Sequence, residues 1–151
     1  MAIEGSYNFR RVNDQVTTSG AVEASHLEHL ASEGYEAVIN LLPDDSEDSL
    51  ANESSIVEAQ GVQYFHIPVD FSAPNESDYS EFSRTLDGLF EKKIHIHCAA
   101  NFRVSAFYSL YAMRTKAWTE KQANEFISSI WNPSDYPGWP ELIERVSQSD
   151  S

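Results

Sequence analysis

The chain has 151 residues, of which 10 are Lys or Arg and 24 are Asp or Glu, so its formal net charge at pH 7 is −14. Hydrophobic residues make up 41% and aromatic residues 12%, a composition that supplies a folded core and excludes a disordered chain. Nucleic acid and anionic membranes are poor partners for it, because their phosphates require a clustered basic face. No apolar run approaches the roughly 20 residues of a membrane span. We therefore expect one soluble domain over residues 1–151, cytoplasmic, or periplasmic if a leader was removed.

The first half of the chain alternates between helical and strand-like patterns. Leu27 and Leu30 have helical spacing, and Gly34 is a typical residue just past a helix end. Four buried-type residues then run together before Pro43, which is typical of a strand covered on both faces. The elements expected here are a helix ending near Gly34, a strand over 36–43, a solvated acidic loop over 44–49, a helix over 50–60 and a strand over 62–69.

The second half continues the alternation. Asn75 is a suitable N-cap for a helix that carries Phe82, Leu86, Leu89 and Phe90 on one face. A strand over 94–98 follows, and then a helix over 104–118. Thr119 and Gln122 form the sequence pattern of a capping box for a helix that reaches Ile130, and Pro140 suits the first position of a last helix.

Strands that alternate with helices predict an α/β domain with a mainly parallel central sheet flanked by helices. The strand over 94–98 would lie at the centre of this sheet. Ligands of such sheets bind beyond the carboxyl ends of the strands, and Cys98, the only cysteine, stands at that edge.

The loop over 98–103 joins a strand end to a helix start, which is the backbone arrangement of an anion site. Its N–H groups, together with the helix dipole, favour a bound anion and a thiolate. Arg103 adds a planar donor for a tetrahedral oxyanion, and the Ser105 hydroxyl can donate to the sulfur. The alternative interpretation is that Cys98 is a small buried hydrophobe, as most lone cysteines are.

The stretch "HCAANFRVS" resembles the signature loop of cysteine-dependent protein tyrosine and dual-specificity phosphatases, which has His-Cys, a short cradle, Arg, and then Ser or Thr. The resemblance is closer to a bacterial branch related to the extra domain of beta-lactamase-like hydrolases. The stretches "TTSGAV", "EGYEAVINLLPDD" and "YFHIPVDFSAP" are similar to that branch, so the resemblance covers residues 8–118. It implies a three-layer phosphatase-like domain that needs no metal and no cofactor.

The resemblance also implies a role for each residue of the loop. Cys98 would be the nucleophile, Arg103 would bind the phosphate oxygens, and Ser105 occupies the place of the usual hydroxyl. His97 would orient the loop and tune the thiol. The cradle would be completed by the backbone of Ala99, Ala100, Asn101, Phe102, Arg103 and Val104.

Asp70 lies 28 residues before Cys98, in the region where these phosphatases hold a general acid on a loop. A carboxylic acid there would protonate the leaving oxygen. A solvated loop carboxylate is the alternative interpretation of Asp70. Glu76 and Asp78 are rival candidates for the acid.

Two departures from the phosphatase pattern bear on the chemistry. Four residues separate Cys98 from Arg103 where the common loop has five, and Asn101 replaces the usual glycine. Asn tolerates the left-handed backbone that such a turn needs. Six-residue loops of this kind resemble those of rhodanese-like sulfurtransferases, in which the cysteine carries a persulfide.

The expected function is hydrolysis of a phosphomonoester, phosphotyrosine included, on a phosphorylated small molecule or protein. The alternatives are a sulfurtransferase that uses a Cys98 persulfide and a weakly active anion-binding or interaction module. A metal site built from His66, His95, His97 and Cys98 lacks a supporting ligand spacing. We interpret the C-terminal aromatic residues as core packing, with a substrate rim as the alternative; they are Trp118, Trp131, Tyr136 and Trp139.

Overall fold

The computed structural model of the protein describes residues 2–149. Its centre is a five-stranded sheet with strand order β1-β2-β5-β3-β4. The first pair of strands is antiparallel and the other pairs are parallel. The strands are β1 (Arg10–Arg11), β2 (Val16–Ser19), β3 (Ala37–Asn40), β4 (Gln63–His66) and β5 (Ile94–His97).

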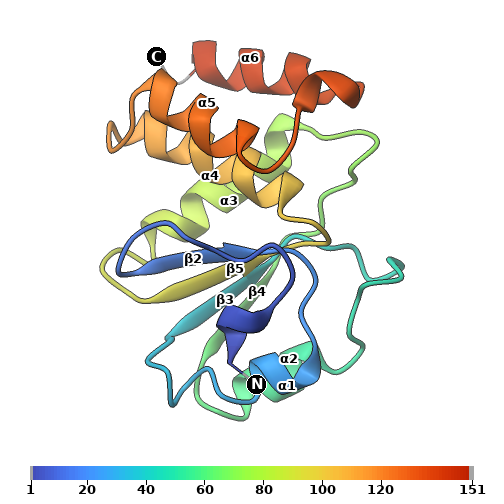
Figure 1. Ribbon diagram of the computed structural model, residues 1–151, viewed down its shortest axis with the longest axis vertical. Helices are drawn as coiled ribbons and strands as arrows, with labels where there is room; N and C mark the ends of the chain where they lie inside the picture. The colour runs from blue at the N-terminus through green and yellow to red at the C-terminus, as the bar shows by residue number, and fades with distance from the viewer. Residues whose placement is uncertain (1, 150–151) are drawn as a thin grey trace.

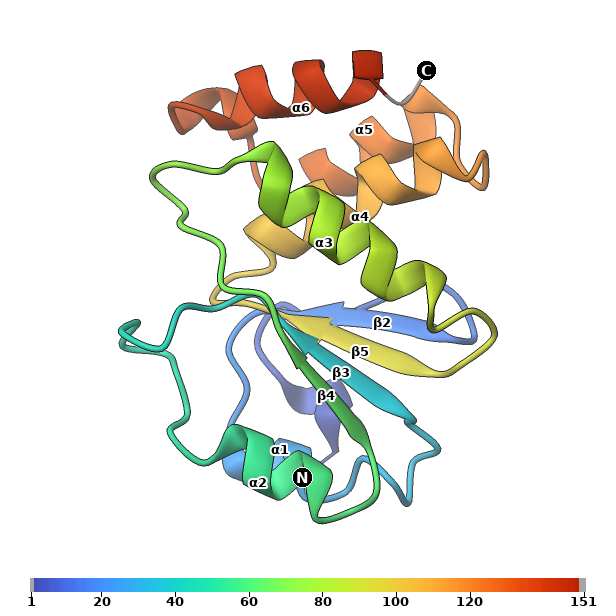
Figure 2. The same cartoon turned by 180° about the vertical axis from the view of Figure 1, so that it is seen from behind.

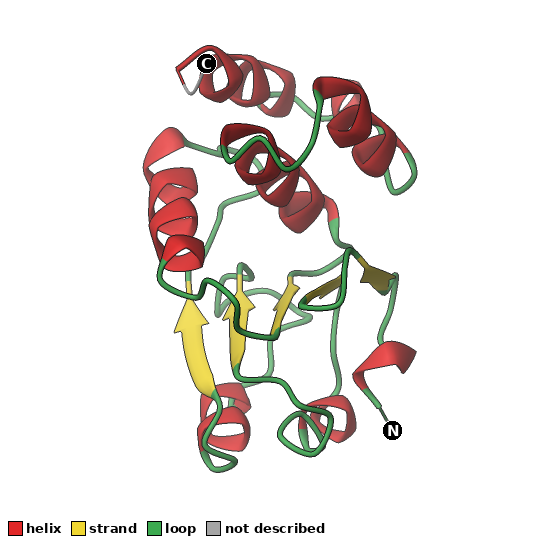
Figure 3. Cartoon of the chain, turned by 90° about the vertical axis from the view of Figure 1, so that its left-hand side faces the viewer, coloured by secondary structure: helices red, strands yellow, loops and turns green. Residues whose placement is uncertain are grey.

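Helices cover both faces of the sheet, as Figures 1 and 2 show. In Figure 1, α1 (Ala24–Leu27) and α2 (Glu53–Glu58) lie below the sheet, and the remaining α-helices lie above it, with α5 (Glu120–Ser128) and α6 (Trp139–Ser149) outermost. The view along the sheet in Figure 3 shows the three layers separately. The helices are α1 (Ala24–Leu27), α2 (Glu53–Glu58), α3 (Glu76–Asp87), α4 (Phe102–Arg114), α5 (Glu120–Ser128) and α6 (Trp139–Ser149), with 3-10 turns η1 (Ile3–Gly5) and η2 (Pro133–Asp135). The predicted α/β class with a mainly parallel sheet is confirmed.

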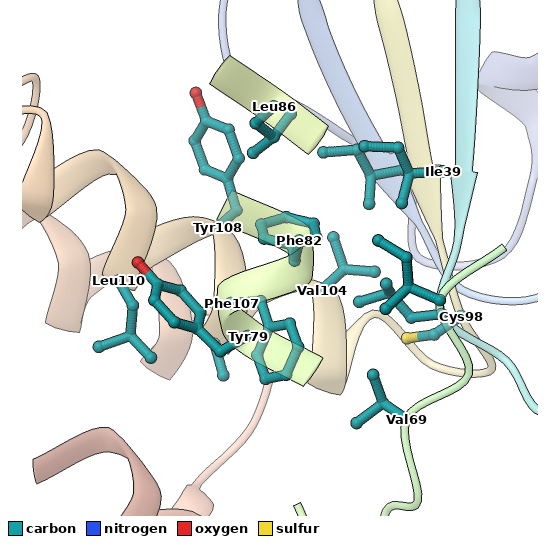
Figure 4. Close-up of a cluster of buried hydrophobic side chains, with 14 of the residues drawn as sticks. Ile39, Val69, Tyr79, Phe82, Leu86, Cys98, Val104, Phe107, Tyr108 and Leu110 are labelled. Carbon is teal, nitrogen blue, oxygen red and sulfur yellow. The ribbon is translucent and has the colours of Figure 1, made fainter. Parts of the chain in front are cut away.

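The alternation of side chains along β5 divides the core into two clusters. Ile94, Ile96 and Cys98 belong to the cluster under α3, α4 and α6, which Figure 4 shows with Cys98 on the side of Val69. His95 points to the opposite face, where it contacts the rings of Phe9 and Tyr35. Because side chains alternate along a strand, His97 shares that second face. The nucleophile candidate and its neighbouring histidine therefore leave the same strand on opposite sides.

Several sequence predictions of element bounds need correction. The sequence pattern predicts Phe90 on the apolar face of α3, but Phe90 follows the end of the helix and is 80% exposed. The helix over 50–60 is shorter, and α4 ends at Arg114 because Lys116 takes a left-handed φ of 64°. The strands β1 and β2 were not predicted. Within residues 2–149, we find no helix with both the length and the apolar character that crossing a membrane requires.

Candidate active site

Cys98 follows the last residue of the central strand and is fully buried. Its backbone N–H donates to Ser19 O at 3.3 Å, which continues the pairing of β5 with β2 beyond the strand end. Burial alone is equally a property of a packed thiol. Burial therefore does not choose between a nucleophile and a packed thiol.

The peptide groups of the loop after Cys98 have a fixed orientation. Ala99 O accepts from the backbone N–H of Ala21 at 2.8 Å, and Ala100 O accepts from the side-chain amide of Asn8 at 2.9 Å. Among residues 2–149, no protein acceptor is bonded to the backbone N–H groups of residues 99–104. A run of free donors at a strand end and helix start is the arrangement that binds an anion.

Asn101 gives the loop its turn. Its φ of 70° and ψ of 8° are left-handed, as the substitution of Asn for glycine predicts. Its side-chain amide donates to Asn8 O at 3.0 Å and to Thr18 Oγ1 at 2.9 Å, so the turn is tied to the segment beside it. Gly20 makes this approach feasible, because a Cβ there would lie 2.6 Å from Ala99 O. The loop is thus built in its curved form by contacts to residues 8–21.

Arg103 carries a charge that the protein itself leaves unpaired. Its guanidinium carbon lies 5.1 Å from the centre of the Phe71 ring. Within residues 2–149 it forms no hydrogen bond or salt bridge, and its Nε is buried without a partner. Since carboxylates outnumber basic residues by more than two to one, an unpaired arginine beside free N–H groups indicates a place for an external anion.

Asp70 is exposed on the loop that follows β4. Its carboxylate accepts from the Ser72 hydroxyl at 2.7 Å and from the Ser72 N–H at 2.9 Å, and these two bonds hold the pKa of Asp70 below its usual value. The charge of Arg103 lowers this pKa further, which places Asp70 within electrostatic reach of the loop. Trp139 Nε1 donates to Phe71 O at 2.9 Å and so anchors the segment beside Asp70.

The two rival acids have other partners. Glu76 accepts from Arg145 Nε on α6 at 2.9 Å. Asp78 accepts from the Asn75 side-chain amide at 3.2 Å in the first turn of α3, where burial raises its pKa. Arg103 contributes to the lowered pKa of Asp70, whereas the causes of the raised pKa of Asp78 do not include it. The geometry therefore favours Asp70 among them.

Ser105 lies behind the loop. Its hydroxyl donates to Phe102 O at 3.0 Å and accepts from Trp131 Nε1 at 2.9 Å. Donation to Cys98 would therefore require the hydroxyl to rotate away from Phe102. Trp131 also stacks on Phe102 at 4.7 Å between ring centres, so this part of the C-terminal aromatic cluster packs against the loop.

Two histidines on β5 have different surroundings. His95 is held between Thr17 Oγ1 at 2.8 Å and Ser19 Oγ at 2.9 Å, and its burial lowers its pKa well below the usual value. His97 Nε2 lies 2.5 Å from Glu53 Oε2, and both side chains are buried. Glu53 was not singled out by the sequence, because one acidic residue in a short helix carries no local signal.

The central strand that ends just before Cys98, the curved loop of free N–H groups and the unpaired Arg103 define an α/β protein with a phosphatase-like fold and a candidate anion site. No family model matches the chain. A DUF442 protein from Shewanella putrefaciens CN-32, described as a phosphatase candidate, is 30% identical and superimposes with a TM-score of 0.90 over 99% of this chain and 97% of that one. The chain therefore belongs to the DUF442 family.

Two further likenesses agree with this class. TpbA from P. aeruginosa, in complex with phosphotyrosine, is 14% identical, with a TM-score of 0.71 over 95% of this chain and 90% of that chain, and shows the shared fold. The beta-lactamase hydrolase-like protein of Agrobacterium fabrum is 27% identical in an alignment of 103 residues that covers 66% of this chain. That match spans only 24% of the Agrobacterium protein. The predicted resemblance to phosphatases and to this bacterial branch is confirmed.

Proposed function

We propose that the protein is a cysteine-dependent phosphatase that hydrolyses a phosphomonoester through a phosphocysteine intermediate. The observation that carries this function is the run of unbonded N–H groups at residues 99–104, which starts next to Cys98, together with the unpaired guanidinium of Arg103 in the same stretch. These donors match a phosphoryl group, whose charge lies on oxygens spread around phosphorus. The phosphatase neighbours, one of them bound to phosphotyrosine, support an aryl phosphate as the first substrate to test.

The first chemical step forms a bond between Cys98 sulfur and phosphorus while the ester P–O bond breaks. The thiolate supplies the electron pair, and the leaving oxygen takes the proton of the Asp70 carboxylic acid. Arg103 and the loop N–H groups bind the non-bridging oxygens as charge shifts during transfer.

The second step returns the enzyme to its starting form. Water attacks phosphorus, the S–P bond breaks, and Cys98 leaves as a thiolate. The Asp70 carboxylate accepts the proton of the attacking water, since it lost its own proton in the first step. Phosphate then departs from the loop.

The test is mass analysis of wild-type protein quenched during turnover of 4-nitrophenyl phosphate. We expect one phosphoryl group on Cys98, none in Cys98→Ser at the same position, and slower formation in Arg103→Ala because the bidentate donor is lost. Arg11→Ala is the matched control, since Arg11 is exposed and pairs with Glu4. The proposal fails if no phosphocysteine forms, and a sulfur atom transferred from thiosulfate to Cys98 would establish the sulfurtransferase alternative instead.

A further inference from the structure

Glu53 and His97 form a buried pair on the face of the sheet opposite Cys98. The exposed fractions of their side chains are 3% and 1%, and Glu53 comes from α2, 44 residues away in sequence. Taking a carboxylate out of water is costly, and a buried pair is often no more stabilising than well-packed apolar residues. A buried carboxylate–histidine pair retained next to the candidate nucleophile therefore suggests a role other than stability.

The hydrogen bonds around Glu53 indicate its charge. Its two oxygens face two donors, His97 Nε2 at 2.5 Å and the Asn40 side-chain amide at 3.4 Å, so the ionised carboxylate satisfies both. Asn40 also donates to the Tyr64 hydroxyl at 3.0 Å. Burial, followed by the charge of Glu53, raises the pKa of Tyr64 to about 12. An ionised Glu53 requires that the His97 Nε2 carry the hydrogen.

Glu53 is also the anchor of the His97 ring. Within residues 2–149, the other ring nitrogen, Nδ1, is buried and has no hydrogen-bond partner. The ring's tautomer and orientation are therefore set from the Nε2 side. His97 is bonded covalently to Cys98, and its strand pairs there with Ser19 and Asn40, so a change at the ring acts where the loop begins.

We propose that Glu53 is a positioning residue for Cys98 and acts through His97. This inference rests on the proposed phosphatase function. The carboxylate fixes the imidazole in one tautomer and one orientation, and the fixed imidazole holds the start of the loop in the geometry that attack on phosphorus requires. An amide in place of the carboxylate can donate as well as accept, so it permits the wrong tautomer while keeping the shape.

The experiment compares the wild-type protein with Glu53→Gln and with Glu58→Gln, a matched control on the exposed side of α2. We expect Glu53→Gln to form phosphocysteine from 4-nitrophenyl phosphate about 10-fold more slowly or worse, while it binds vanadate as the wild type does. Glu58→Gln should match the wild type in both. Phosphocysteine formation at the wild-type rate in a folded Glu53→Gln protein would overturn the proposal and leave the pair a purely structural one.

A second measurement needs only the wild-type chain, in case Glu53→Gln does not fold. Nitrogen NMR of the imidazole rings should show hydrogen on His97 Nε2, and vanadate should shift the His97 ring signals more than those of His95. His95 is the internal control, because it lies on the same strand face but is held by hydroxyl groups. Unchanged His97 signals in vanadate-bound protein would overturn the inference. Absence of phosphocysteine in the wild type would instead refute the proposed function, and the NMR comparison would still decide the role of Glu53.

Discussion

Asn101 combines two demands at one residue, a left-handed backbone and two side-chain hydrogen bonds. Asn101→Ala and Asn101→Gly both remove the side-chain hydrogen bonds, but only glycine adopts the left-handed backbone conformation at no steric cost. We expect the alanine variant to be less stable than the glycine variant by about 1 kcal/mol, the cost of a Cβ in this conformation. Urea unfolding of the two variants measures the difference. Equal stabilities would mean that the turn is held by its neighbours and is not limited by local backbone strain.

Asp70 presents an acid whose pKa the structure lowers, chiefly through Ser72. A lowered pKa means that less of the acid form exists at neutral pH, so hydrolysis of phosphates with poor leaving groups should accelerate as pH falls toward that pKa. Ser72→Ala removes the largest cause, so the pKa should rise and the rate on poor leaving groups at neutral pH should increase. Asp70→Asn should abolish both effects, while substrates with good leaving groups respond little. Initial rates against pH for two phenyl phosphates test this.

The lowered pKa of Asp70 also makes its contribution to the stability of the fold depend on pH. The unfolded chain carries Asp70 at its ordinary pKa, and the folded pKa is lower. The contribution of Asp70 is therefore present above the unfolded pKa and is lost as pH falls through the folded one. Because Asp70 is exposed, Ser72→Ala should change the rate profile much more than the unfolding curve.

At the scale of single elements, the start of α5 is determined by residues that lie close together in the sequence. Thr119 Oγ1 accepts from Gln122 N at 3.2 Å, and the Gln122 side chain accepts from Thr119 N at 2.8 Å, as the predicted capping box requires. Thr119→Ala should therefore lower the free energy of unfolding by about 1 kcal/mol. Thermal or urea unfolding measures the loss. Thr119→Ser, which keeps the hydroxyl, should recover most of it, and failure to do so would assign the loss to packing.

The elements that could be predicted are those whose signals lie within a few residues. Caps and apolar spacing predicted α3 and α5, and a run of apolar residues predicted β3. β2 could not be predicted in this way, because three of its four residues are polar and are satisfied by distant partners. Thr17 bonds to His95, and Thr18 accepts from Asn101, 83 residues away. Its burial follows from the fold and not from its own sequence.

The candidate site likewise contains residues that a local pattern could predict and residues that it could not. Cys98 and Arg103 stand close enough in sequence for a strand, loop and helix start to indicate an anion cradle. The residues that shape this cradle come from elsewhere: Asn8 ties the loop from 92 residues away, and Glu53 reaches His97 from α2. These contacts are absent from any local pattern, because they depend on the parallel pairing of β5 with β2 and β3.

For the whole molecule, the net charge of −14 opposes the approach of a phosphorylated substrate even though the loop itself offers free donors and Arg103. This repulsion acts over the distance between molecules, and salt screens it: the Debye length falls from about 30 Å at 0.01 M to about 10 Å at 0.1 M. The contacts between the loop and a bound phosphate are much shorter than the Debye length, so salt screens them less. We therefore expect kcat/KM for an aryl phosphate to rise with salt over this range while kcat changes little. Salt weakens the repulsion that slows the encounter with substrate, and it does not act on the chemical step. The rise should be larger for a phosphopeptide with added acidic residues than for one with added lysines. A fall of kcat/KM with salt for both peptides would show that the local charge of Arg103 outweighs that of the whole surface.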